Sequence, residues 1–466
     1  MNFVAQQELK KNAIGMWRAL AQGLGMNGPA AVTALYFVGL AALVGGAVPL
    51  IVLLAWIIYV GMTVIVYEWS KIQSSSHGWT GIQKKGLGTP FAFFGTWGYW
   101  YYYLTGLSGF AILGFSSFAY VLFPSIGTHY PWLWIPISLA VIGVTYLLVY
   151  LGINPSASYQ LYTGIAEVIF VIITSLALVV IAGGHNTLSV FGAGPVGGDW
   201  TLIFVAMIFG ITTFGGMNGV IPVAEETNNP KKNVPRALLI LTLILGFTLI
   251  LSSYAQTVIY GVANMSSYAG LPDPGVLIYE KYFGVVIAGI FAIFILNSFF
   301  SASVAFTNNT IRMAYGTARD NVIFPKSFMK LNKHGIPYIN LTVTMIIAIV
   351  LILATGLWLG PLLAGVFLIV SNAFFNYLNH MLAGIGIARY HYKHKSLKIV
   401  RHVIIPALVI IALGFAIAYA IYPAPAAPLN YAAWVAGVWI VVGIIVYLYL
   451  RSKKPDELKK LGDFSV

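Results

Sequence analysis

The feature that most constrains the fold is a succession of long apolar stretches separated by short polar turns. About 20 helical residues are needed to cross roughly 30 Å of hydrocarbon, and several stretches reach that length. Only 8% of the 466 residues are charged, against about 25% in a typical soluble protein. The sequence therefore predicts an all-α polytopic membrane protein with twelve transmembrane helices. They are expected at residues 17–44, 48–70, 88–122, 132–151, 156–183, 200–223, 237–262, 283–315, 337–356, 361–390, 402–422 and 429–450.

Lysine and arginine are distributed unevenly among the turns. Cytoplasmic loops of membrane proteins are enriched in these residues. If the N-terminus lies inside, 24 of the 25 basic residues fall on the inner side and only Lys281 falls outside. We therefore expect a multi-pass protein of the cell membrane with both termini cytoplasmic. The net charge of +13 is spread over six loops, which favours contact with the lipid bilayer and no nucleic-acid partner.

The amino-acid composition argues against several kinds of functional site. The chain has no cysteine, which excludes disulfides, iron–sulfur clusters and thiol catalysis. The eight histidines show no metal-binding spacing, so no cofactor is expected beyond a possible coupling ion. A membrane-embedded enzyme would need a cluster of acid, base or nucleophile side chains inside the bilayer. One acid, Glu167, lies in the middle of a predicted span, so no enzymatic activity is predicted. Nothing in the sequence specifies an oligomeric state.

Two glycine-rich segments interrupt the first and sixth predicted helices. The tetrapeptide Gly-Met-Asn-Gly occurs at 25–28, next to Pro29, and again at 216–219, before Pro222. Five spans separate the two, so the helices run in opposite directions, as expected for an inverted repeat. Broken helices in matching halves mark the central site of many transporters: half-helix N-termini attract a carboxylate, and freed carbonyls receive a cation. The alternative is that the glycines only allow close helix packing.

Four sequence motifs resemble those of the amino acid–polyamine–organocation (APC) permeases. They are "WRALAQGLGMNGPAA" (17–31), "SSSHGWTGIQKKGLG" (74–88), "AEETNNPKKNVPRA" (224–237) and "ARDNVIFPKSFMKLNKHGIPYI" (318–339). The resemblance implies a five-plus-five inverted repeat with unwound helices 1 and 6, plus two extra helices. The expected parts are a cytoplasmic N-terminal segment (1–16), a first repeat (17–183), an extracellular loop (184–199), a second repeat (200–391), helices 11 and 12 (392–450) and a basic cytoplasmic tail (451–466).

The resemblance also implies a substrate site at the two breaks. The substrate carboxylate is expected near the backbone N–H groups of residues 28–31, and the amine near the helix 6 carbonyls of residues 211–214. Asn218 stands where many family members have Asp or Glu, which argues against a dedicated cationic substrate. Asn27 and Asn218 could contact the substrate or hold the unwound backbone. The expected substrate-binding residues are Gly25, Asn27, Gly28, Ala30, Ala31, Tyr101, Phe209, Ile211, Thr212, Phe214, Gly216 and Asn218.

The resemblance further implies that ion coupling takes place between helices 1, 5 and 8. Burying a lone carboxylate is costly unless it is protonated, paired or bound to a cation. Glu167 is therefore predicted either to titrate as the coupling group or to help hold a cation. The alternative is a permanently protonated, hydrogen-bonded side chain. Ser298 and Ser301 on helix 8 are possible sodium ligands, although hydroxyl groups in membrane helices more often bond between helices.

The sequence as a whole predicts a secondary active transporter. It is expected to import neutral amino acids by alternating access and symport with a proton or sodium. A transporter or exchanger of polyamines or other organic amines is the alternative. A channel and a membrane receptor that does not transport are further hypotheses. The expected partners are a small-molecule substrate and the lipid bilayer.

Overall fold

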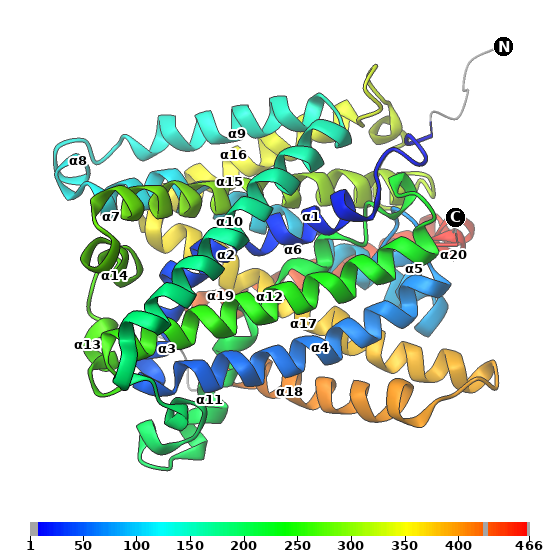
Figure 1. Ribbon diagram of the computed structural model, residues 1–466. Coiled ribbons are helices and arrows are strands. Elements are labelled where there is room, and N and C mark those ends of the chain that lie inside the picture. The colour runs from blue at the N-terminus through cyan, green and yellow to red at the C-terminus, as the bar shows by residue number, and fades with distance from the viewer. Residues whose placement is uncertain (1–7, 423–426, 464–466) are drawn as a thin grey trace.

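The computed structural model describes residues 8–422 and 427–463. The first seven residues of the predicted N-terminal segment and the last three of the predicted tail lie outside this part. The described residues form helices and no strand, apart from two isolated bridges. Figure 1 shows the long helices running side by side in one bundle, with the start of α1 and the helix α20 at the same end.

The first half of the chain contains helices α1 to α10, and two π-helical segments interrupt it. These elements are α1 (Met16–Asn27), α2 (Pro29–Ala31), η1 (Val32–Tyr36), α3 (Phe37–Val44), α4 (Val48–Ile72), α5 (Trp79–Leu87), α6 (Thr89–Ala111), η3 (Ile112–Phe118), α7 (Ala119–Leu122), α8 (Pro124–His129), α9 (Trp134–Tyr150) and α10 (Ile153–Ala182).

The second half contains helices α11 to α20. Its principal elements are α11 (Trp200–Ile211), η7 (Gly216–Gly219), η8 (Ala224–Glu226), α12 (Pro230–Tyr260), α13 (Met265–Tyr268), α14 (Pro274–Phe283), α15 (Val285–Ala318), α16 (Tyr338–Leu359), α17 (Pro361–Lys393), α18 (Ile405–Ile421), α19 (Tyr431–Lys453) and α20 (Pro455–Lys460).

Each predicted stretch coincides with a helical segment. In the described part of the chain, ten segments are long and apolar enough to cross a membrane. The first of them, Met16–Ile72, is 57 residues long and contains the first two predicted stretches. The fourth predicted stretch corresponds to α9, an apolar helix of 17 residues. The number of twelve crossings stays a prediction.

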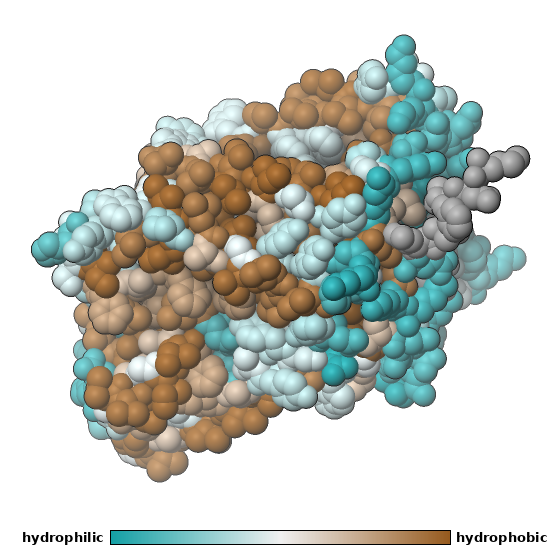
Figure 2. Space-filling model, turned by 90° about the horizontal axis from the view of Figure 1, so that it is seen from above, coloured by the Kyte–Doolittle hydropathy of each residue, from teal (hydrophilic) through white to brown (hydrophobic). Residues whose placement is uncertain are grey.

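The outer surface of the bundle is apolar along the helices and polar at one end. Figure 2 shows hydrophobic residues covering much of one side, and hydrophilic residues gathered at the end where the described chain begins. Many large apolar side chains on α10, α18 and α19 are exposed. A soluble protein rarely leaves such extended apolar patches in water. The protein is therefore a multi-pass membrane protein.

Both predicted helix breaks are present, and they face each other. Gly28 has a left-handed backbone conformation (φ 64°, ψ 70°) and separates α1 from α2. The other break follows Ile211, where α11 ends and a short 3₁₀ turn begins at Gly216. A Cβ atom placed on Gly216 would lie only 2.0 Å from the carbonyl oxygen of Gly23. The two backbones therefore touch at a position where only glycine fits.

Candidate functional site

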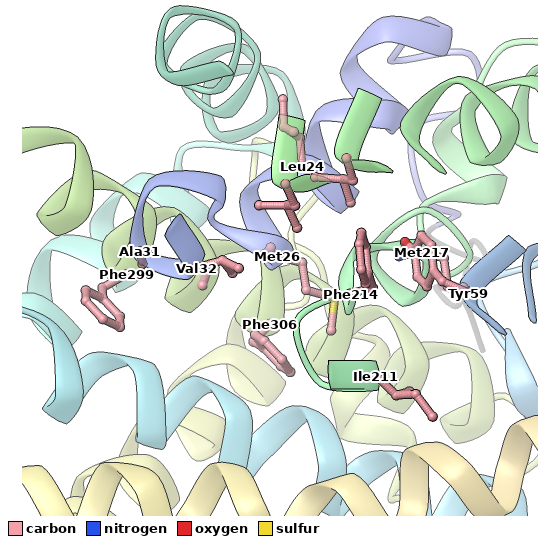
Figure 3. Close-up of a cluster of buried hydrophobic side chains, with 14 of the residues drawn as sticks. Leu24, Met26, Ala31, Val32, Tyr59, Ile211, Phe214, Met217, Phe299 and Phe306 are labelled. Atoms are coloured by element: carbon pink, nitrogen blue, oxygen red, sulfur yellow. Dashed lines mark hydrogen bonds between the residues drawn. The ribbon is translucent and has the colours of Figure 1, made fainter. Parts of the chain in front are cut away.

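A cavity of about 70 Å³ lies between the two helix breaks. Figure 3 shows part of its surroundings, with Met26 from α1 and Phe306 from α15 close to the loop that carries Phe214. The lining residues come from the first break, α6, the second break, α15 and α17. They are Met26, Asn27, Val32, Tyr36, Tyr102, Phe110, Ile211, Thr212, Phe214, Gly215, Phe306, Ile369, Asn372, Ala373, Asn376 and Tyr377. None of these sixteen described residues is charged.

Asn27 links the two breaks and also lines the cavity. Its Nδ2 donates a hydrogen bond of 2.9 Å to the carbonyl oxygen of Thr213. The side chain is buried, and its Oδ1 has no hydrogen-bond partner among the described residues. Asn27 therefore holds the unwound backbone while leaving an acceptor atom unpaired.

Asn218 holds the second break against helices α6 and α17. Its Oδ1 accepts from the Tyr99 hydroxyl at 3.1 Å, and its Nδ2 donates to Asn376 Oδ1 at 2.9 Å. The Tyr103 hydroxyl donates to the Asn218 carbonyl at 3.0 Å. Asn218 does not line the cavity, so in this structure it secures the backbone behind the lining residues.

The peptide groups just after the first break already have protein acceptors. Ala30 N donates to Glu167 Oε1 at 2.7 Å, and Ala31 N donates to Ser298 Oγ at 3.2 Å. Gly28 packs on Ser298, since an added Cβ would lie 3.0 Å from that side chain. These three residues face α10 and α15 and lie outside the cavity lining. The expected carboxylate contacts at residues 28–31 are thus occupied by internal hydrogen bonds.

Four other predicted residues also lie outside the cavity lining. The Tyr101 hydroxyl donates to Ser371 Oγ at 2.9 Å, and the neighbouring Tyr102 lines the cavity instead. Phe209 is 49% exposed on the outer surface of α11. Gly25 and Gly216 are packing positions. Of the predicted set, the structure brings Asn27, Ile211, Thr212 and Phe214 together around the cavity.

Glu167 is 2% exposed and forms three hydrogen bonds. Oε1 accepts from Ala30 N and from Ser298 Oγ at 2.5 Å, and Oε2 accepts from Asn297 Nδ2 at 3.2 Å. No ion pair to Glu167 is present in the described part of the chain. The carboxyl group therefore connects the start of α2 to α15 through neutral donors.

Gln160, which precedes Glu167 on α10, lies between α1, α10 and α15. Gln160 Nε2 donates to the Ser301 carbonyl at 2.9 Å. A Cβ on Gly25 would lie 2.4 Å from Ser301 Oγ and 2.6 Å from Gln160 Nε2. Of the two predicted sodium ligands, Ser298 is bonded to Glu167, while Ser301 Oγ has no partner among the described residues. Those residues also contain no cluster of three His, Cys, Asp or Glu suited to a metal.

Two ion pairs attach the end of the second break to α15 and the segment after it. Both guanidinium Nη atoms of Arg319 donate to Glu225 at 2.7 Å. Glu226 pairs with Arg312, which is fully buried. The sequence analysis counted Arg312 only among the basic residues of the inner side and did not predict its pairing with Glu226. Its position within the apolar run of helix 8 was the signal that could have singled it out.

Sequence reasoning also missed the contribution of α17. Asn372, Asn376 and Tyr377 are buried residues of this helix that line the cavity. Residues four apart lie on one face of a helix, and amide side chains within membrane helices are costly unless they have a role. The spacing of Asn372 and Asn376 in "SNAFFNY" carried this signal.

A family model described as amino acid permease matches residues 14–446. The chain belongs to the amino acid permease family. This confirms the resemblance to the APC permeases. The relatives described next are permeases and transporters rather than enzymes.

Three relatives illustrate the range of this family. The chain is 30% identical to the lysine-specific permease LysP of Lactococcus lactis, over 49% of this chain and 46% of LysP. It is 27% identical to the branched-chain amino acid permease BcaP of Bacillus subtilis, over 44% and 42%. It is 26% identical to the D-serine/D-alanine/glycine transporter of Escherichia coli, over 61% and 60%. The matched part of the chain spans about half the length of these relatives.

The fold resembles that of a protein whose structure has been solved. The crystal structure of MhsT in complex with L-phenylalanine aligns with a TM-score of 0.62 at 14% identity. The alignment covers 88% of this chain and 100% of that chain. At this identity the similarity concerns the fold.

Proposed function

We propose that the protein imports neutral amino acids across the cell membrane by alternating access. The observation that carries this proposal is the uncharged cavity between the two helix breaks. A cationic side chain placed there would lose its hydration without meeting an anionic partner, which is strongly unfavourable. The ammonium group of an amino acid could instead use backbone carbonyl dipoles at the second break. Family membership supports amino acids as the substrate class.

Alternating access requires contacts that can be broken at one end of the cavity. The Glu225–Arg319 and Glu226–Arg312 pairs join the second break to α15 at the end where the described chain begins. The positive-inside distribution assigns this end to the cytoplasm. Their separation would accompany opening to the cytoplasm.

We further propose that proton binding to Glu167 drives uptake. The ionised carboxylate accepts hydrogen bonds from Ala30 N, Ser298 Oγ and Asn297 Nδ2. Protonation weakens the carboxyl group as an acceptor, so it loosens the attachment of α2 to α15. This links the proton to the position of the half-helix beside the substrate cavity. Gln160 Nε2 already donates to the Ser301 carbonyl, so this oxygen is engaged and is not a free ligand for sodium at this helix crossing.

Transport by purified protein in proteoliposomes tests both proposals. We expect counterflow of neutral amino acids, together with accumulation driven by an inward proton gradient and insensitive to sodium. Glu167→Gln should abolish accumulation driven by the proton gradient while leaving counterflow in place, because exchange needs no net proton movement. Unchanged accumulation in Glu167→Gln would refute the coupling proposal. Exchange of polyamines alone, or ligand binding without exchange, would refute the proposal of amino acid import.

A further inference from the structure

The cavity contains polar atoms that the protein leaves unpaired. Tyr377 is 5% exposed, lines the cavity, and its hydroxyl has no hydrogen-bond partner among the described residues. Asn27 is 7% exposed and lines the same cavity, and its Oδ1 also has no hydrogen-bond partner among the described residues. Buried polar groups in proteins nearly always have a partner. Two unpaired groups on one small cavity therefore indicate a ligand that carries hydrogen-bonding groups.

The surroundings of Tyr377 are polar but neutral. Tyr36 and Tyr102 also line the cavity. Asn372 lies one helical turn before Asn376 on the same wall. This wall can donate and accept hydrogen bonds, and it offers no formal charge to an ammonium or carboxylate on a substrate side chain.

The remaining lining is apolar and the space is small. Phe110, Phe306 and Ile369 line the cavity as well. The volume of about 70 Å³ is several times the minimum of about 10–15 Å³ that a cavity needs to hold a single water molecule. A short side chain fits such a space, whereas an aromatic side chain would require the cavity to expand.

We propose, on the basis of the proposed function, that the cavity selects small neutral amino acids whose side chain carries a hydroxyl or carboxamide group. The hydroxyl group of Tyr377 determines this preference. A substrate hydroxyl gives Tyr377 the partner that the protein lacks. A methyl group in the same place leaves Tyr377 buried and unpaired. Sites built to hydrogen-bond a substrate group discriminate strongly against analogues that lack the group.

Threonine and valine provide the sharpest test, because they have nearly the same shape and differ by a hydroxyl. We expect wild-type protein in proteoliposomes to take up threonine at least about tenfold more efficiently than valine. Tyr377→Phe removes the hydroxyl and should bring this ratio close to one, mainly by slowing threonine uptake. Tyr101→Phe is the matched control, since the Tyr101 hydroxyl is bonded to Ser371 outside the cavity lining. This control should keep the wild-type ratio.

The outcomes separate the inference from the proposed function. Equal uptake of threonine and valine by the wild type, or an unchanged ratio in Tyr377→Phe, would overturn the inference while transport itself remains. Absence of transport for every amino acid would overturn the proposed function, and the inference with it. Thermal stabilisation of the wild-type protein by threonine and by valine gives a second readout that needs no variant. Stronger stabilisation by threonine is expected, and equal stabilisation would also overturn the inference.

Discussion

Because the two broken helices touch at Gly216, we expect the substitution Gly216→Ala to destabilise the protein strongly. A Cβ at this position would lie 2.0 Å from the Gly23 carbonyl oxygen and 2.8 Å from its carbonyl carbon. Both atoms belong to backbone, so no flexible side chain can move aside, and the helices must separate to restore ordinary contact. Overpacking a core costs about 1–3 kcal/mol. We expect the upper end of this range, about 3 kcal/mol, because the obstacle is rigid.

The matched control is the adjacent glycine. A Cβ on Gly215 would meet no atom within 4 Å, and the φ of this residue is negative, at −122°, so alanine meets no left-handed backbone strain there. Thermal unfolding of both variants in the same detergent measures the difference. Gly216→Ala should melt several degrees below Gly215→Ala, and its counterflow should be impaired. Equal melting temperatures for the two variants would refute the close contact of the breaks.

Two further substitutions test buried charges. Burial raises the pKa of Asp273, in the segment before α14, from 3.8 to about 7. The stability linked to its protonation is therefore present below about pH 4 and lost as the pH rises to about 7. In thermal unfolding, Asp273→Asn should stabilise the protein by about 3 kcal/mol more at pH 8 than at pH 5, and an equal effect at both pH values would contradict the raised pKa. Arg312→Met leaves Glu226 buried without its partner and should cost about 3–5 kcal/mol, with much of the loss recovered in the double variant that also carries Glu226→Gln. Recovery would be absent if the pair made no contact.

The long elements and the breaks could be predicted because their signals are local. Apolar length determines where helices can cross a bilayer. The glycine and proline residues beside Asn27 and Asn218 mark where the helices unwind. These signals depend on neighbouring residues alone, and the structure shows helices and breaks at the expected places.

The cavity lining was harder to predict because it depends on helix rotation. Successive residues on a helix point about 100° apart, so Tyr102 lines the cavity and Tyr101 does not. Phe209, on α11, points to the outer surface. Phe214, beyond the end of α11, lines the cavity. The residues of α17 are about 150 positions from the second break in sequence. Only tertiary packing brings them there.

The surroundings of Glu167 could be predicted from the sequence only in part. Its position in mid-membrane predicted a buried carboxyl group that requires compensation. The structure supplies compensation from Ala30 N, Ser298 and Asn297. A backbone N–H carries no sequence signature, so the Ala30 contact could be found only from coordinates.

Filling the cavity tests the central claim most directly. Ala373 lines the cavity from α17, and Ala373→Trp would place an indole in a space of about 70 Å³. The control is Ala140→Trp, at an exposed position on α9 in a separate groove on the outer surface. In proteoliposome counterflow of neutral amino acids, we predict that folded Ala373→Trp is inactive and that Ala140→Trp exchanges at the wild-type rate. Wild-type exchange by folded Ala373→Trp would contradict the assignment of this cavity as the transport site.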